Sequence, residues 1–82
     1  MIPVHKLLIK FLKDTHTDKS EFEIVISDSA GRLSYYSLED VMADEKNPET
    51  FTLIDKDDNF NRIPYASVRK VLRNEKPVWE SN

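Results

Sequence analysis

The first residues of the chain carry apolar side chains at the spacing of an amphipathic helix. Five of them fall on one face, at i, i+3, i+4, i+7 and i+8: Val4, Leu7, Leu8, Phe11 and Leu12. This spacing predicts a helix of about three turns. Pro3 suits the first turn, where its missing N–H leaves no hydrogen bond unmade. Lys6, Lys10 and Lys13 fall on the opposite face, so the helix should present a row of cations to solvent.

The remaining apolar residues alternate with polar ones over short segments, which is the pattern of half-buried strands. Phe22, Ile24 and Ile26, for example, share one face of the segment Phe22–Ile26. Five more segments are predicted strands: Arg32–Tyr36, Thr50–Asp55, Phe60–Ile63, Ser67–Arg73 and Pro77–Trp79. A turn over residues 27–31 uses Gly31, the only glycine, for a positive φ. Residues 37–42 are predicted to form a short helical turn.

The segment Ser67–Arg73 fits two patterns. Val68, Val71 and Leu72 suit a helix, but residues 74–76 look like a hairpin turn into the last strand, which favours a strand. The predicted fold class is therefore α+β, with the N-terminal helix packed on a small, curled, mainly antiparallel sheet of about five strands. A chain of 82 residues makes one domain, so we assign residues 1–82 to a single domain.

Charge is distributed unevenly along the sequence. The net charge of −3 conceals basic ends, with +3 over residues 1–13 and +3 over residues 59–82, and an acidic middle of −9 over residues 14–58. If the fold brings the two ends together, they could form a cationic face on an acidic protein. The alternative is that the basic and acidic segments neutralise each other across the fold.

Several functional classes find no support in the composition. The absence of cysteine excludes thiol catalysis, thiolate zinc sites and disulfides, and it favours the cytoplasm for a domain this small. A single glycine excludes a glycine-rich phosphate loop. No apolar run approaches the roughly 20 residues that span a bilayer, so no membrane partner is expected. No nucleophile–base pair is evident, so we predict that this chain alone is not an enzyme and needs no cofactor.

Two patterns resemble metal sites only superficially. His5 and His16 are eleven residues apart with no cysteine or acidic motif beside them, so we predict no metal site. The run Asp55-x-Asp57-x-Asn59 matches the first half of a calcium loop. However, Phe60 stands where that loop requires glycine, and Ala66 stands where it requires a bidentate acid. An Asx-rich hairpin turn is the better interpretation.

Aromatic and basic residues are interleaved in the second half of the chain. Tyr35, Tyr36, Tyr65 and Trp79 could stack single-stranded bases or fill a small core, and Trp79 is expected to be at least half buried. Basic residues near them in the sequence could contact phosphates: Arg62, Arg69, Lys70, Arg73 and Lys76.

The last third of the chain, residues 62–80, resembles the closing motif of the RNA cyclic-group end recognition domain. That motif runs Ile-Pro-x-His-Arg-Ile, then alternating apolar and basic residues, a turn, and a final Val-Trp with a charged residue. Ile63-Pro64 and Val78-Trp79 match it with no gap between them. The family also opens with a short amphipathic helix ending in aspartate, as Val4–Asp14 does, followed by a strand like Phe22–Ile26. The resemblance implies a small domain that recognises RNA ends.

The closing motif departs from the family at the positions best suited to hold a terminal phosphate. The family's His-Arg pair is Ala66-Ser67 here, and its turn glycine is Glu75. Histidine and arginine both donate hydrogen bonds to phosphate oxygens, whereas alanine cannot and serine is only a neutral donor. The apolar skeleton and the basic positions Arg69 and Arg73 remain.

Two functions therefore follow from the sequence. The first is an RNA-binding module for single-stranded RNA or a terminal phosphate, in which Lys10, Arg62, Arg69 and Arg73 contact phosphates and Tyr65 stacks on a base. The second is a protein–protein interaction or accessory domain with no nucleic-acid ligand. In the second case Arg69 and Arg73 would pair with acids of the strand that contains Glu21 and Glu23.

Overall fold

The computed structural model describes residues 2–81 and contains one α-helix and two antiparallel sheets. The helix is α1 (Val4–Lys13). The four-stranded sheet has the order β2-β1-β6-β7, formed by β1 (Phe22–Ser27), β2 (Leu33–Ser37), β6 (Val68–Arg73) and β7 (Lys76–Glu80). The three-stranded sheet has the order β3-β4-β5, formed by β3 (Val41–Ala43), β4 (Thr50–Ile54) and β5 (Phe60–Pro64). The α+β class, the helix and the strand character of residues 68–73 are confirmed.

The single curled sheet of about five strands was wrong, because two short 3-10 turns carry the chain from one sheet to the other. The turn η2 (Leu38–Asp40) leads from β2 into β3, and the turn η3 (Tyr65–Ser67) leads from β5 into β6. Each turn lies between a strand of one sheet and a strand of the other, so the two turns mark the points at which the chain changes sheets. The turn predicted over residues 37–42 is thus only η2, capped by the Ser37 side chain, and β3 follows it directly.

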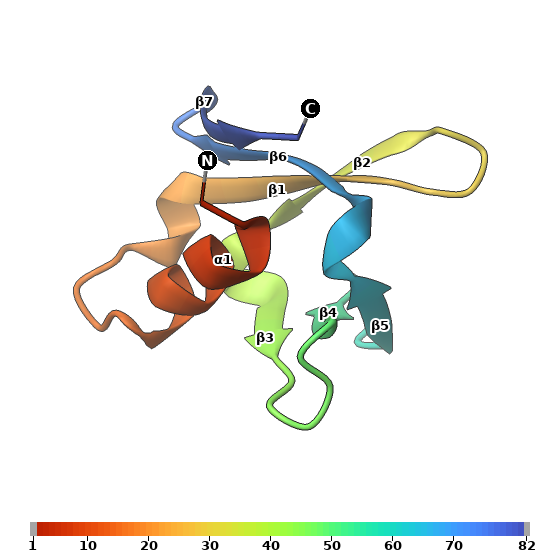
Figure 1. Cartoon of the computed structure of the whole chain (residues 1–82), viewed down its shortest axis with the longest axis horizontal. Helices are drawn as coiled ribbons and strands as arrows, with labels where there is room; N and C mark the ends of the chain where they lie inside the picture. The colour runs from red at the N-terminus through yellow and green to blue at the C-terminus, as the bar shows by residue number, and fades with distance from the viewer. Residues whose placement is uncertain (1, 82) are drawn as a thin grey trace.

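Both sheets and the helix share one apolar core. In Figure 1 the four-stranded sheet lies across the top, and α1 and the three-stranded sheet lie side by side beneath it. Leu8 of α1, Ile24 of β1, Phe51 of β4 and Val71 of β6 are fully buried in this core. The helix contributes the apolar face predicted from its spacing, and Lys6, Lys10 and Lys13 are exposed as expected.

One row of side chains crosses the inner face of the four-stranded sheet. Tyr36 of β2 lies opposite Ile24, Ile24 lies opposite Val71, and Val71 lies opposite Trp79 of β7. Trp79 is more than half buried, as expected, and its Nε1 donates a 2.9 Å hydrogen bond to the carbonyl oxygen of Ile2. This bond fixes β7 against the start of the chain, and Figure 1 shows the two ends of the molecule close together.

No helix among residues 2–81 is long and apolar enough to cross a membrane.

Candidate functional site

The basic residues predicted to bind phosphate lie on three different elements. Lys10 projects from α1, Arg62 from β5, and Arg69 and Arg73 from β6. Arg73 is bound to the carboxylate of Glu21, with both Nε and Nη2 at 3.1 Å from Oε2. The Arg73 guanidinium also lies 5.5 Å from the centre of the Phe22 ring. For Arg73 the structure therefore shows the competing arrangement, in which the arginine pairs with an acid next to β1.

Arg62 and Arg69 make different contacts. Arg62 lies 3.9 Å from a carboxylate oxygen of Asp44, at the limit of an ion pair, and Arg69 donates a 2.9 Å hydrogen bond to the carbonyl oxygen of Ala66. Arg62 is in the three-stranded sheet and Arg69 is in the four-stranded sheet. Arg62, Arg69 and Arg73 thus each contact a different acceptor: Asp44, the Ala66 carbonyl and Glu21.

Tyr65 is not available to stack on a base, contrary to the sequence-based expectation. It is only 6% exposed, and its ring packs 5.1 Å from the Phe51 ring and 6.0 Å from the imidazole of His5. Burial, together with the negative charge of Asp44, raises the pKa of its hydroxyl. The η3 turn directs this side chain into the core, so Tyr65 is a structural residue.

The two positions, Ala66 and Ser67, at which the closing motif departs from the family pattern it resembles lie in η3. Ala66 is exposed, and the hydroxyl of Ser67 donates a 2.7 Å hydrogen bond to the carbonyl oxygen of Pro64. The Ser67 hydroxyl hydrogen is therefore used within the turn. Neither residue presents a free cationic donor to a phosphate.

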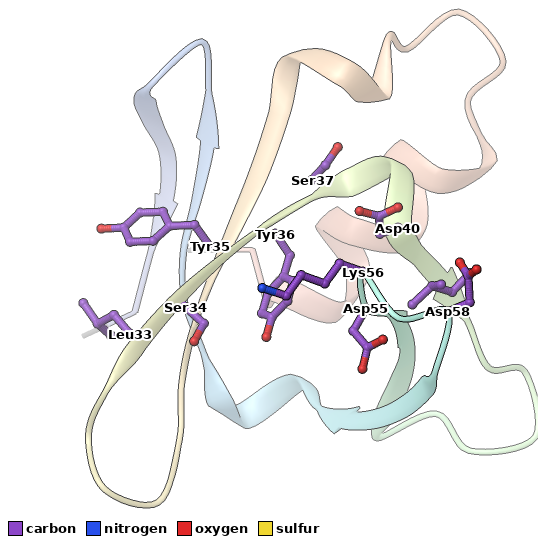
Figure 2. Close-up of a pocket in the computed structure, with 10 residues that line it drawn as sticks. Leu33, Ser34, Tyr35, Tyr36, Ser37, Asp40, Asp55, Lys56 and Asp58 are labelled. Atoms are coloured by element: carbon purple, nitrogen blue, oxygen red, sulfur yellow. The ribbon is translucent and has the colours of Figure 1, made fainter.

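A concavity lies beside β2, at a place where the sequence had not indicated a site. We call it the β2 groove. It has a volume of about 670 Å³. One wall is the whole of β2 with Asp40 of η2. The other wall is Ile54 at the end of β4 and the turn that follows it, with Asp55, Lys56 and Asp58. In Figure 2 the Tyr36 ring points into the groove and the Lys56 side chain extends toward it from the opposite wall, while Tyr35 points away.

The β2 groove carries an excess of negative charge. Asp40, Asp55 and Asp58 line it together with a single cation, Lys56. Asp55 is held in place by the turn, because its Oδ1 accepts hydrogen bonds from the N–H groups of Asp57 and Asn59, at 2.9 and 3.0 Å. The Asn59 N–H and the Asn61 side chain lower the pKa of Asp55, so this carboxylate stays ionised. The groove is suited to a cation.

An apolar pocket continues the β2 groove toward the tip of the β1–β2 hairpin. The pocket has a volume of about 380 Å³ and shares Ser34 and Tyr36 with the groove. Its apolar lining comes from Ile26, Ile63 and Pro64. A ligand lying along β2 would thus meet three carboxylates at one end and, at the other, a mainly aliphatic pocket that Asp28 also lines.

The signals for this site were present in the sequence but were assigned elsewhere. Tyr35 and Tyr36 are two of the four aromatic residues that could stack bases, and Asp55 and Asp57 belong to the run that matches half of a calcium loop. The hydrogen bonds of Asp55 confirm the Asx-type turn. Within residues 2–81, no group of three or more His, Cys, Asp or Glu side chains is arranged to hold a metal ion.

No family model, curated protein or solved structure matches the chain.

Proposed function

We propose that this chain is a protein-interaction module that binds an extended, positively charged segment of another protein in the β2 groove. The observation that carries the proposal is the composition of the groove, where three carboxylates and two tyrosines surround one lysine. A lysine or arginine side chain entering the groove would gain ion pairs with Asp40 and Asp58 and a contact with the Tyr36 ring. A phosphate group would meet like charge there.

RNA binding stays the competing prediction, supported by the resemblance of the closing motif. RNA binding would depend on the basic residues that lie outside the β2 groove. Among residues 2–81, Lys10 and Arg69 form no ion pair, so they are the members of the predicted set that remain available to phosphates. The paired Arg73 and the buried Tyr65 argue against that set acting together.

The two functions predict opposite effects of one substitution in the groove. Lys56→Gln removes the resident cation, so a lysine-rich extended peptide should bind about two- to fivefold more tightly, as expected for one exposed charge interaction. Single-stranded RNA should bind no better. The measurement is an NMR titration of the native protein and the variant with each ligand. Lys46→Gln is the matched control, because it makes the same charge change on an exposed loop residue outside the groove.

A second pair of measurements gives the result that would replace this proposal. If RNA binds the native protein, and if Arg69→Ala/Arg73→Ala lowers its affinity and reduces the salt slope by about two counterions, the protein is an RNA-binding module. Peptide binding that is unchanged by Lys56→Gln would also contradict a site in the groove.

A further inference from the structure

The free edge of β2 presents backbone groups that no other strand uses. The hairpin closes with the Asp28 N–H donating to the Arg32 carbonyl oxygen at 3.0 Å. Antiparallel ladders alternate between hydrogen-bonded and non-hydrogen-bonded pairs, so Ser34 and Tyr36 continue the bonding to β1. The N–H and C=O groups of Leu33 and Tyr35 then point away from β1. Within residues 2–81, β2 pairs with β1 alone.

Nothing in β2 protects this edge against another strand. Natural edge strands are usually blunted by proline, a bulge or a charged side chain. The residues Leu33–Ser37 contain no proline and no charge, and their register with β1 is unbroken. Tyr35 is 60% exposed and Leu33 is 53% exposed, on the outer side of the edge. The edge is therefore a template for strand addition.

We infer that the partner segment binds as an added antiparallel strand on β2, with a basic residue at the acidic end of the groove and an apolar residue two positions later in the adjoining pocket. This inference rests on the proposed function and specifies its ligand. Side chains two apart in a strand lie on the same face, about 6.6 Å apart. An antiparallel segment enters at the Ser37 end, so it meets Asp40 first and the pocket beside Ile63 afterwards.

The intervening residue of the partner would face outward. There it would lie next to the exposed rings and aliphatic groups of Tyr35 and Leu33, where β-branched side chains make good cross-strand pairs. The expected ligand is thus a strand-forming segment in which a basic residue, a β-branched residue and an apolar residue follow one another. This mode of recognition takes its affinity from main-chain hydrogen bonds and its specificity from alternate side chains.

A second copy of this chain is a poorer occupant of the same edge. Antiparallel pairing of two β2 strands would place the same acidic groove on both sides of the junction. Each copy would bring three groove carboxylates, Asp40, Asp55 and Asp58, against one lysine, Lys56, so an excess of negative charge would meet the same excess. Charge complementarity instead selects a basic segment from a different protein.

The test uses a synthetic peptide of about nine residues, long enough to cover β2, with one lysine and one valine two positions after it in a threonine background. Binding should shift the backbone amide signals of Leu33 and Tyr35 in NMR spectra. N-methylation of the peptide residues whose N–H groups face β2 should weaken binding at least about tenfold, since it removes ladder donors and adds a clash. N-methylation of the intervening residues should leave the affinity unchanged. Exchanging the lysine and valine positions should also weaken binding.

Two protein variants separate this inference from the function on which it rests. Asp40→Asn/Asp58→Asn should weaken binding of the lysine peptide about fivefold, whereas the matched control Glu45→Gln/Asp57→Asn, outside the groove, should not. If the aspartate variant weakens binding but both N-methylated peptides bind equally, strand addition is refuted and the peptide-binding function stands. If no lysine peptide perturbs the groove, the proposed function itself fails.

Discussion

The four-stranded sheet ends in two edge strands of five residues, β2 and β7, that are protected very differently. β7 contains Pro77, which has no N–H to offer, and its register with β6 is interrupted between Val71 and Leu72. It also carries charges at both ends, Lys76 and Glu80, and is held by the bond from Trp79 to Ile2. β2 has none of these devices and lies beside a groove. This contrast between the two edges of one sheet is the structural basis of the proposed partner site on β2.

The comparison predicts that the two edges contribute unequally to stability. Trp79→Ala should lower the free energy of unfolding by about 3 kcal/mol, because it removes a large side chain packed on the core together with the bond to Ile2. Tyr36→Ala, at the other end of the same row, should cost about 1–2 kcal/mol, since its ring faces the groove. Urea unfolding followed by circular dichroism measures both. Equal losses of unfolding free energy would mean that Tyr36 on β2 contributes as much to stability as Trp79 on β7, which would contradict the comparison.

Substitutions in the hairpin turns next to the two edge strands should change the stability of the protein in opposite directions. Gly31 has φ +80° in the β1–β2 turn and nothing within 4 Å of an added Cβ, so Gly31→Ala should cost about 1 kcal/mol from backbone strain alone. In the β6–β7 turn, Asn74 and Glu75 both have positive φ, at 51° and 70°. Glu75→Gly would create the Asn-Gly pair that this type of turn prefers and should raise stability by up to about 1 kcal/mol.

The control for the second substitution is Glu75→Ala, which changes the charge but keeps the strained backbone. Thermal unfolding should show a gain for glycine and none for alanine. A similar gain for both would assign the effect to charge and leave the conformation of the turn without influence.

The smallest expected effect is a loss of stability at acidic pH, and it arises from Asp55 in the far wall of the β2 groove. Hydrogen bonds within the β4–β5 turn lower the pKa of Asp55 in the folded protein below its unfolded value of about 3.9. The stabilisation is therefore complete above that pH and is lost as the pH falls through the folded pKa. Asp14, Asp18 and Asp44 add to the loss in the same direction.

Urea unfolding at a series of pH values between neutral and about 3 measures this dependence. Asp55→Asn should flatten it, and Asp57→Asn, whose side chain accepts none of the turn's hydrogen bonds among those found in residues 2–81, should not. An unchanged profile for Asp55→Asn would show that the carboxylate of Asp55 does not hold the turn.

Much of the fold could be read from periodicity because burial follows it directly. The helical spacing from Val4 to Leu12 and the alternation of Phe22, Ile24 and Ile26 each place apolar groups on one face, and the structure buries or half-buries those faces. The division into two sheets could not be read in this way. It depends on η2 and η3, three-residue turns that are too short to leave a periodic signal.

The site was harder to predict, because a surface groove is assembled by tertiary packing. Tyr35, Tyr36 and Tyr65 have the same side chain, yet one is exposed, one faces the groove and one is in the core. Which of these occurs depends on the turn or strand that carries each residue. In the same way, the spacing of Arg62, Arg69 and Arg73 could not reveal that they would lie on two sheets with separate acceptors.

The central position of β1 has a consequence for how the chain is made. β1 pairs on one side with β2, which follows it after a short turn, and on the other with β6, more than half the chain length away. During synthesis at about 5–20 residues per second, the β1–β2 hairpin can form in microseconds but must then wait seconds for β6. Until then the second edge of β1 is open, and its Ile24-Val25-Ile26 run is of the kind that associates between chains. The nascent protein is therefore most exposed to misassembly just before residues 68–73 emerge.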